Sequence, residues 1–303
     1  YSRYIATMKK YLVILVIFLI TMSAYGQRNE VGISGSGMYY IGDLNPYYHF
    51  YFTRPGGGLY YRYNYRDYLS VRLFGNYGSV RAADSLLNYY PERKLHFRSQ
   101  ILEVGVVAEI NYYKFRPGTI KHFFSPYLFL GINWFYFNPQ AKYNDEWVDL
   151  QPMGTEGQGT TFYPDRKPYS LNSFAIPMGI GVKIALSETF VCHIEWGMRY
   201  TFTDYIDDVS TTYPDPLVLA SQIDPIAPYL SDPNLLNHTE LNSSNTDKWR
   251  GDPSTNDWYS VINVGLSFRF KNKTMKCEGM NPRYRDKRKD YEYNLKNKNK
   301  ISF

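Results

Sequence analysis

The residues whose types and spacing could support chemistry are His193 and Glu195, which lie two positions apart in the sequence. If residues 190–203 form a strand, both side chains point to the same face, because successive side chains on a strand alternate. A buried histidine beside a carboxylate can act as a general base with its orienting group. No Ser or Thr stands beside the pair as a nucleophile. The sequence therefore favours a structural role for His193, as one polar side chain within an enclosed interior.

Three aspartates follow this stretch, Asp204, Asp207 and Asp208, and their oxygens could bind Ca²⁺. They lack the alternate-residue spacing of calcium-binding loops, so no metal site is predicted. The sequence also has no glycine-rich phosphate loop, no Cys-x-x-Cys pair and no His-Glu-x-x-His motif. We predict that the protein is not an enzyme and needs no cofactor.

The stretch that must position His193 and Glu195 is residues 174–203, which reads as two strands joined by a turn at 186–189. In both strands large apolar residues such as Ile180 and Trp196 alternate with small or charged residues such as Lys183 and Arg199. One face is thus apolar over six or seven positions and the other is charged. A strand with lipid on one side and a polar lumen on the other has this pattern, which indicates a transmembrane β-barrel.

Six further segments alternate in the same way, which predicts an all-β, eight-stranded antiparallel transmembrane barrel. The predicted strands cover residues 30–40, 58–65, 69–80, 98–112, 126–137, 174–185, 190–203 and 258–270. Short links at 66–68, 113–125 and 186–189 alternate with long loops at 41–57, 81–97, 138–173 and 204–257. This asymmetry is typical of barrels with periplasmic turns and extracellular loops. A soluble lipocalin-like barrel is the alternative, and it would bury the apolar face inside.

The chain has the composition of an exported membrane protein. Lys9 and Lys10, the apolar run 11–20 and the small residues around position 25 predict a signal peptide over residues 1–26. Residues 1–7 precede Met8 and could be an upstream extension. Tyrosine is abundant, at 32 of 303 residues, as aromatic girdles at two membrane interfaces require. We expect residues 27–270 to form the barrel in the outer membrane, in contact with its lipids.

The inward face of the predicted strands carries a near balance of charge. An eight-stranded barrel is just wide enough for side chains to fill it, and buried charges persist only when they are paired. We therefore predict a closed, salt-bridged lumen and no porin. The predicted luminal ionic network consists of Glu30, Arg62, Arg72, Glu103, Glu109, Lys183, His193, Glu195, Arg199 and Arg269. Inward glycines, among them Gly179, Gly181 and Gly197, are expected to make room for the long arginines.

Two segments carry opposite net charge. Residues 204–257 hold ten Asp or Glu against two cations, and we expect a long, partly irregular extracellular or lumen-capping loop. Residues 271–303 hold eleven Lys or Arg against four acids and form a basic periplasmic tail. This tail is either a solvated extension or a docking arm for an acidic periplasmic partner. The compartment excludes nucleic acid. The predicted docking residues are Lys271, Lys273, Lys276, Arg283, Arg285, Lys287, Arg288 and Lys289.

The two cysteines, Cys192 and Cys277, are too few for a disulfide framework. Cys277 lies close enough in sequence to the end of the last strand to reach Cys192 in an oxidising compartment. Because Cys192 points toward lipid, we expect two free thiols, with a disulfide as the alternative.

Two segments at strand ends resemble a known family: residues 39–45 (Tyr-Tyr-Ile-Gly-Asp-Leu-Asn) and residues 199–210 (Arg-Tyr-Thr-Phe-Thr-Asp-Tyr-Ile-Asp-Asp-Val-Ser). The chain is similar to the PorG-like outer-membrane barrels of the Bacteroidetes type IX secretion system. This resemblance implies an accessory, non-enzymatic role that ties the periplasmic ring of the machine, a lipoprotein and a ring subunit, to the outer membrane. A surface adhesin or receptor and a lipid-modifying barrel enzyme remain alternatives.

Overall fold

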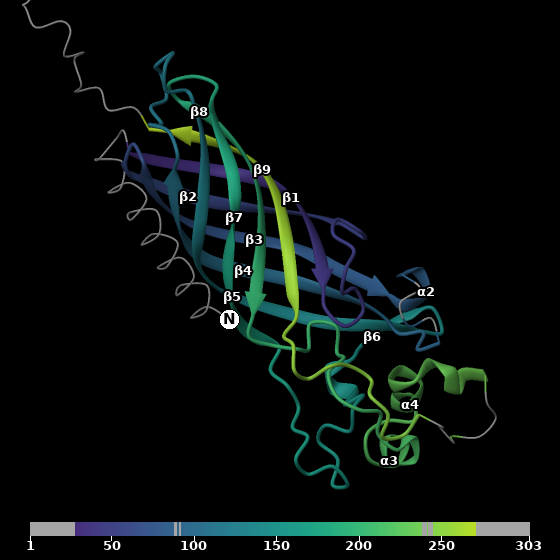
Figure 1. Ribbon diagram of the computed structural model, residues 1–303. Helices are drawn as coiled ribbons and strands as arrows, with labels where there is room; N and C mark the ends of the chain where they lie inside the picture. Colours follow the sequence, from purple (N-terminus) through teal and green to yellow (C-terminus); the bar gives the residue numbers. More distant parts are fainter. Residues whose placement is uncertain (1–27, 88–89, 91, 238–240, 242–244, 271–303) are drawn as a thin grey trace, which may run out of the picture. The chain divides into compact units, whose positions relative to one another are not determined.

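A computed structural model describes residues 28–87, 90, 92–237, 241 and 245–270. The predicted signal peptide, the basic tail with its docking residues, and Cys277 lie outside these residues, so those predictions stay untested. Residues Arg28–Arg269 form one compact unit. Its long strands, shown in Figure 1, are β1 (Asn29–Ile41), β2 (Arg54–Arg66), β3 (Leu69–Ala83), β4 (His96–Asn111), β5 (Phe124–Tyr143), β7 (Asn172–Ala185), β8 (Phe190–Thr201) and β9 (Trp258–Arg269).

These eight strands close into a barrel. Each pairs antiparallel with its neighbour in the order β4-β3-β2-β1-β9-β8-β7-β5, and the pairing of β4 with β5 closes the sheet. The short strand β6 (Glu146–Asp149) pairs with β5 as a hairpin beyond the barrel wall. Among the described residues, the predicted eight-stranded antiparallel barrel is confirmed.

The two faces of the wall are also as predicted. Ile180 on β7 pairs in register with Trp196 on β8, and both point outward. Large apolar side chains such as Ile33 and Leu128 are more than half exposed on this outer surface, while the luminal charges are buried. Such an exterior is unstable in water and suits a bilayer, contrary to the lipocalin-like alternative. The protein is therefore an outer-membrane β-barrel.

Short links gather at one end of the barrel, the predicted periplasmic end. Asp67 and Tyr68 alone connect β2 to β3, and residues 186–189 connect β7 to β8. Arg116, in the link between β4 and β5, forms a 2.6 Å ion pair with Asp67, which joins two neighbouring turns. The predicted short turns are confirmed at one end of the barrel, and their periplasmic location stays a prediction.

Three of the four connections at the other end are shorter than predicted, mainly because β2, β3, β4 and β5 extend beyond their predicted ends, whereas the connection from β8 to β9 begins two residues earlier than predicted. β2 begins at Arg54, β3 ends at Ala83, β4 begins at His96 and β5 ends at Tyr143. Where a strand extends above the bilayer, both of its faces can carry polar residues, because its outer face meets water. The alternation of apolar and polar residues that marks a lipid-facing strand is then lost, and these strand ends cannot be predicted from the sequence. The barrel wall therefore rises past the membrane surface.

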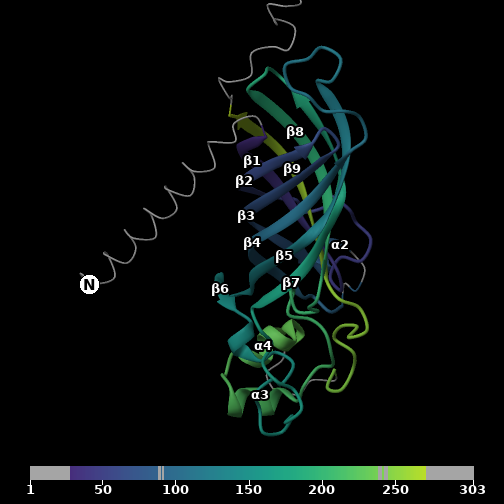
Figure 2. The same cartoon turned by 90° about the vertical axis from the view of Figure 1, so that its left-hand side faces the viewer.

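The loops at this end form a folded cap, which we define as the described residues within 42–53, 84–95, 144–171 and 202–257. It contains the helices α2 (Asp84–Leu87), η2 (Gln151–Met153), α3 (Pro216–Gln222), α4 (Ala227–Ser231) and η3 (Pro233–Asn237), and α3 and α4 lie beyond the ends of the strands in Figure 2. The expected long, partly irregular loop at 204–257 thus contains α3, α4 and η3 between irregular stretches. An apolar core that includes Leu44, Phe97, Phe137 and Ile206 joins the cap to the strand ends. No helix in the described ranges is long and apolar enough to cross a membrane.

Candidate functional site

The centre of the lumen is a cluster of six ionised side chains, Glu30, Arg62, Arg72, Glu109, Lys183 and Glu195, which we call the Glu109 cluster. Lys183 Nζ lies 2.6 Å from Glu109 Oε2, and Arg62 Nε and Arg72 Nε each lie 2.8 Å from a Glu109 oxygen. Arg62 also reaches Glu30 at 3.1 Å. Each of the six side chains comes from a different strand, so the cluster ties opposite walls of the barrel together.

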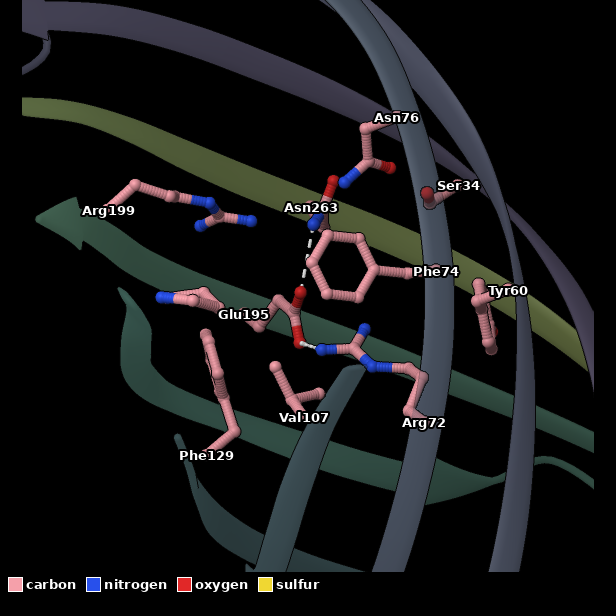
Figure 3. Close-up of a pocket in the computed structure, with 11 residues that line it drawn as sticks. Ser34, Tyr60, Arg72, Phe74, Asn76, Val107, Phe129, Glu195, Arg199 and Asn263 are labelled. Carbon is pink, nitrogen blue, oxygen red and sulfur yellow. Dashed lines mark hydrogen bonds and ion pairs between the residues drawn. The ribbon is translucent and has the colours of Figure 1, made fainter. Parts of the chain in front are cut away.

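Glu195 connects the other members of the Glu109 cluster to the rest of the interior, and Figure 3 shows its contacts with Arg72 and Asn263. Arg72 donates to Glu195 at 2.7 Å, Tyr127 donates to the same carboxylate at 2.6 Å, and Asn263 donates at 2.8 Å. Each charge therefore has several partners, which is the condition under which buried ions are tolerated.

A second cluster lies apart from the first. Arg199 Nη2 lies 3.2 Å from Glu103 Oε1, and the same carboxylate accepts from Tyr259 at 2.7 Å and from Asn76 at 2.7 Å. The single luminal network of the prediction is therefore two clusters in the structure. Every predicted member except His193 and Arg269 belongs to one of them.

Aromatic rings fill the space between the two clusters. Tyr60, Phe74, Val107, Tyr127 and Phe129 pack as one buried group. A Cβ at Gly197 would come within 2.4 Å of the Phe129 ring and one at Gly179 within 2.8 Å. The inward glycines thus make room mainly for rings, and the expectation that they accommodate arginines holds only in part, at Gly197, where Arg199 is a further neighbour.

A cavity of about 10 Å³ remains beside Glu195, lined by Arg72, Phe129 and Asn263 among others. This space holds about one water molecule. Asn263 Oδ1 has no protein hydrogen-bond partner in the described residues and faces this region, so a water there would satisfy it. The ionised side chains of both clusters are at most 4% exposed, so the lumen is filled rather than open to solvent.

His193 and Glu195 do not form the base and orienter that their spacing would allow. The carboxylate of Glu195 accepts from Arg72, Tyr127 and Asn263 instead. His193 is fully buried, and its Nδ1 lies 3.1 Å from the Tyr60 hydroxyl. Arg269 lies at the periplasmic end of β9, in register with Glu30 and half-buried, outside the fully buried part of the lumen.

Four carboxylates meet where the cap covers the lumen: Asp43, Asp204, Asp207 and Asp257, which we call the acid cluster. The Tyr40 hydroxyl lies 2.6 Å from both Asp207 Oδ2 and Asp257 Oδ1. A phenol carries one proton, so the second of these short contacts requires a proton on a carboxyl group. The two oxygens of Asp204 are buried and have no hydrogen-bond partner within the described part of the chain.

The surroundings of the acid cluster favour these protons. Burial, followed by the nearby Asp257 carboxylate, raises the pKa of Asp204 to about 9. Burial raises the pKa of Asp257 to about 8 and that of Asp43 to about 6, and it raises the pKa of Asp207 well above its usual value. Carboxyl groups that share a dry site cannot all ionise together. The net negative charge of residues 204–257 is therefore partly neutralised by protons.

Two arginines join the loops of the cap. Arg93 makes a bidentate pair with Asp84 at 2.7 and 2.8 Å and donates to the backbone oxygens of Asp43 and Arg250. Arg250 lies 3.2 Å from Glu156, which also accepts from the backbone of Ser210. In the described ranges no three His, Cys, Asp or Glu side chains are placed to hold a metal ion, and Asp204, Asp207 and Asp208 do not converge as Ca²⁺ ligands.

The outer surface of the cap has a groove of about 1200 Å³ between the segments 41–47, 90–93 and 245–258. Trp249 and Tyr47 line it and are 71% and 69% exposed. Arg93, Asp252 and Asn256 add polar groups to the same lining. A concave surface with exposed rings and a few polar groups is typical of ligand sites.

A comparison with known families places the chain. The profile described as "Domain of unknown function (DUF6089)" matches residues 9–216. The chain belongs to the DUF6089 family. This match covers the barrel from β1 through β8 and part of the cap.

Solved outer-membrane barrels are similar to this DUF6089 protein only remotely. The attachment invasion locus protein Ail of Yersinia pestis is 10% identical, with a TM-score of 0.37, over 81% of this chain and 99% of that chain. Neisserial surface protein A is 10% identical, with a TM-score of 0.41, over 80% of this chain and 97% of its own. OprG of Pseudomonas aeruginosa is 12% identical, with a TM-score of 0.38, over 82% and 98%. At such values the barrel assignment rests on the strand pairing itself. No curated protein matches the DUF6089 chain.

Several residues that build the site escape prediction from the sequence. In the lumen these are Tyr60, Tyr127 and Tyr259, whose hydroxyls contact His193, Glu195 and Glu103 respectively. Their signal is a tyrosine at an inward position of an alternating strand. In the cap they are Glu156 and Arg250, for which loop sequences give no periodic signal.

Proposed function

We propose that this protein is a non-conducting, non-enzymatic scaffold of the outer membrane, which serves the type IX secretion machinery by tying its periplasmic ring to the membrane. The observation that carries the proposal is the closed lumen, in which the Glu109 cluster is buried and tied to opposite walls. On this proposal the two ends of the barrel and its lipid face are the working surfaces.

The buried position of His193 supports the non-enzymatic part of the proposal. Its ring faces Tyr60 in the lumen, and a Cβ at Gly265 would come within 2.1 Å of it. A lipid on the outer wall has no route to this ring, which disfavours the lipid-modifying alternative.

The assignment to secretion comes from the two family-like segments, residues 39–45 and 199–210. Tyr40 in the first donates to Asp207 in the second, and Asn45 Nδ2 donates to the Tyr40 backbone oxygen at 2.7 Å. The segments that carry the resemblance thus form one contact at the base of the cap. The residues that resemble the PorG-like barrels therefore act together in this fold, and the role shared with those barrels is our proposal.

The basic tail would contact the acidic surface of the ring proteins, a lipoprotein and a ring subunit. Affinity isolation of the tagged protein from membranes tests this directly. We expect ring proteins to co-purify with the full chain and to be lost when Arg283, Arg285 and Lys287 are replaced by Gln. Replacing Lys296, Lys298 and Lys300 by Gln removes the same charge from the same tail and serves as the matched control. Absence of ring proteins from the wild-type sample would refute the secretion role.

The cap groove favours a second candidate, a surface receptor or adhesin. Trp249 and Tyr47 expose rings to solvent on the extracellular side. If ligand recognition is the main role, Trp249→Ala should abolish binding of whole cells to their target while ring proteins still co-purify. Tail variants should have the opposite effect if the scaffold role is correct.

A further inference from the structure

The loop between β1 and β2 turns back over the outside of the barrel. Phe50 packs with Tyr39 at a ring-centroid distance of 5.2 Å and with Trp196 at 6.1 Å. Tyr39 and Trp196 face outward from β1 and β8, and Trp196 Nε1 donates to the Tyr39 hydroxyl at 2.9 Å. His49 contacts the same two rings. Tyr39 is therefore completely covered although it lies on the lipid-facing side.

The contacts of the loop place it against the apolar outer surface of the wall. Trp196 pairs in register with Ile180 on β7 and Ile262 on β9, which both point outward from the wall. At the other end of the loop, the Phe52 ring lies 5.0 Å from the guanidinium of Arg81 on β3. The loop therefore crosses the outer surface between β8 and β3, close to the extracellular rim.

The residues that cross this surface form an uncharged run, Tyr-Tyr-His-Phe-Tyr-Phe at positions 47–52, which we call the aromatic loop. Tyr47, Tyr48, Phe50 and Tyr51 are 69%, 51%, 55% and 48% exposed. A continuous apolar surface of this kind marks an interaction site, because large rings exposed to water are unfavourable. It is continuous with the lipid-facing surface of the barrel through Tyr39 and Trp196.

The aromatic loop is held in a defined conformation. The Asn45 side chain donates to the backbone oxygens of Tyr40 and Tyr48 and accepts from the Tyr48 N–H. Phe50 and Phe52 have φ angles of 64° and 55°, a left-handed conformation that is costly for bulky residues. Strain of this kind persists where the surroundings fix the backbone, and it is concentrated at functional segments.

We propose that the aromatic loop inserts into the headgroup region of the outer leaflet and anchors the cap to the membrane surface. Tyrosine and phenylalanine are favoured at this level because their rings are apolar and the tyrosine hydroxyl remains hydrated. The absence of charge at positions 46–53 suits the lipid boundary rather than an acidic or basic partner. Because Tyr47 also lines the cap groove, insertion fixes the groove close to the lipid.

Depth-dependent quenching in lipid vesicles tests this proposal. In a background of Cys192→Ser and Cys277→Ser, a fluorophore is attached to Tyr48→Cys or to Tyr51→Cys. These variants leave the packing of Phe50 against Trp196 intact, and protease resistance of the barrel confirms folding before labelling. Thr161→Cys, exposed in the cap, gives the aqueous reference, and Ile180→Cys gives the reference for the bilayer interior.

We expect labels at positions 48 and 51 to be quenched by phosphatidylcholine that carries a spin label near its headgroup. Iodide in the buffer should quench them severalfold less than the label at position 161. The proposal is wrong if iodide quenches both labels as strongly as at 161 while the spin-labelled lipid has no effect. Protection from both quenchers also overturns it, because a protein surface would then cover the loop.

Discussion

Replacing Glu109 by Gln removes the one carboxylate that faces three buried cations. Arg62, Arg72 and Lys183 all lie within 2.8 Å of its oxygens. In the Glu109→Gln variant these cations share Glu30 and Glu195, and the amide can satisfy only part of their hydrogen bonds. Loss of one partner from a buried ion pair destabilises by about 3–5 kcal/mol, so we expect at least the lower end of that range.

The assay is urea unfolding from phosphatidylcholine vesicles, followed by the fluorescence of the five tryptophans. Glu103→Gln is the matched control, since Glu103 faces one cation, Arg199, and keeps neutral donors such as Asn76. Its destabilisation should be smaller. Adding Lys183→Met to Glu109→Gln removes one of the surplus cations and should restore part of the lost free energy, a non-additive result.

A small effect would refute the closed lumen. If Glu109→Gln unfolds within about 0.5 kcal/mol of the wild type, as a surface substitution does, water must reach the Glu109 cluster. The same conclusion would follow if Lys183→Met gave no recovery in the double variant.

The remaining predictions concern the wall, the lumen and the cap. Ile180→Arg should destabilise the barrel in vesicles by about 2–4 kcal/mol, because it places a charge in the bilayer. If the variant is as stable as the wild type, the assignment of the lipid-facing and luminal faces is wrong. The purified protein should give no steady channels in planar bilayers, and nanosiemens-scale openings would contradict the filled lumen. Burial raises the pKa of Asp257 to about 8 and that of Asp204 to about 9, above the pKa of 3.8 in the unfolded chain. The protonated carboxyl groups therefore contribute stability to the cap that is complete only below pH 3.8. That contribution is lost as the pH rises through 8 and 9, so cap amides should exchange faster than the intrinsic pH dependence requires, and Asp204→Asn should weaken the effect.

The strands and their faces follow from the sequence because two solvents act on them. Ile180 and Trp196 are apolar because they face lipid, and Lys183 and Glu195 are charged because they face the enclosed lumen. Apolar and polar residues therefore alternate clearly along these strands. The identity of the central carboxylate does not follow in the same way. Glu109 and Glu103 are both inward on β4, and only the stagger between strands brings three cations to Glu109 and one to Glu103.

Beyond the bilayer water surrounds the chain on all sides, and the alternation of apolar and polar residues weakens. The extension of β5 to Tyr143, the helices within 202–257 and the path of the aromatic loop depend on contacts between distant segments. Tyr40 and Asp207 illustrate this, since they are 167 positions apart and meet through a single hydrogen bond. Each residue is unremarkable within its own segment, and the buried acid cluster exists only when the loops fold together. The roles of individual residues can therefore be predicted best in the strands, where lipid constrains the sequence. They are hardest to predict in the cap, where ligands and partners would be recognised.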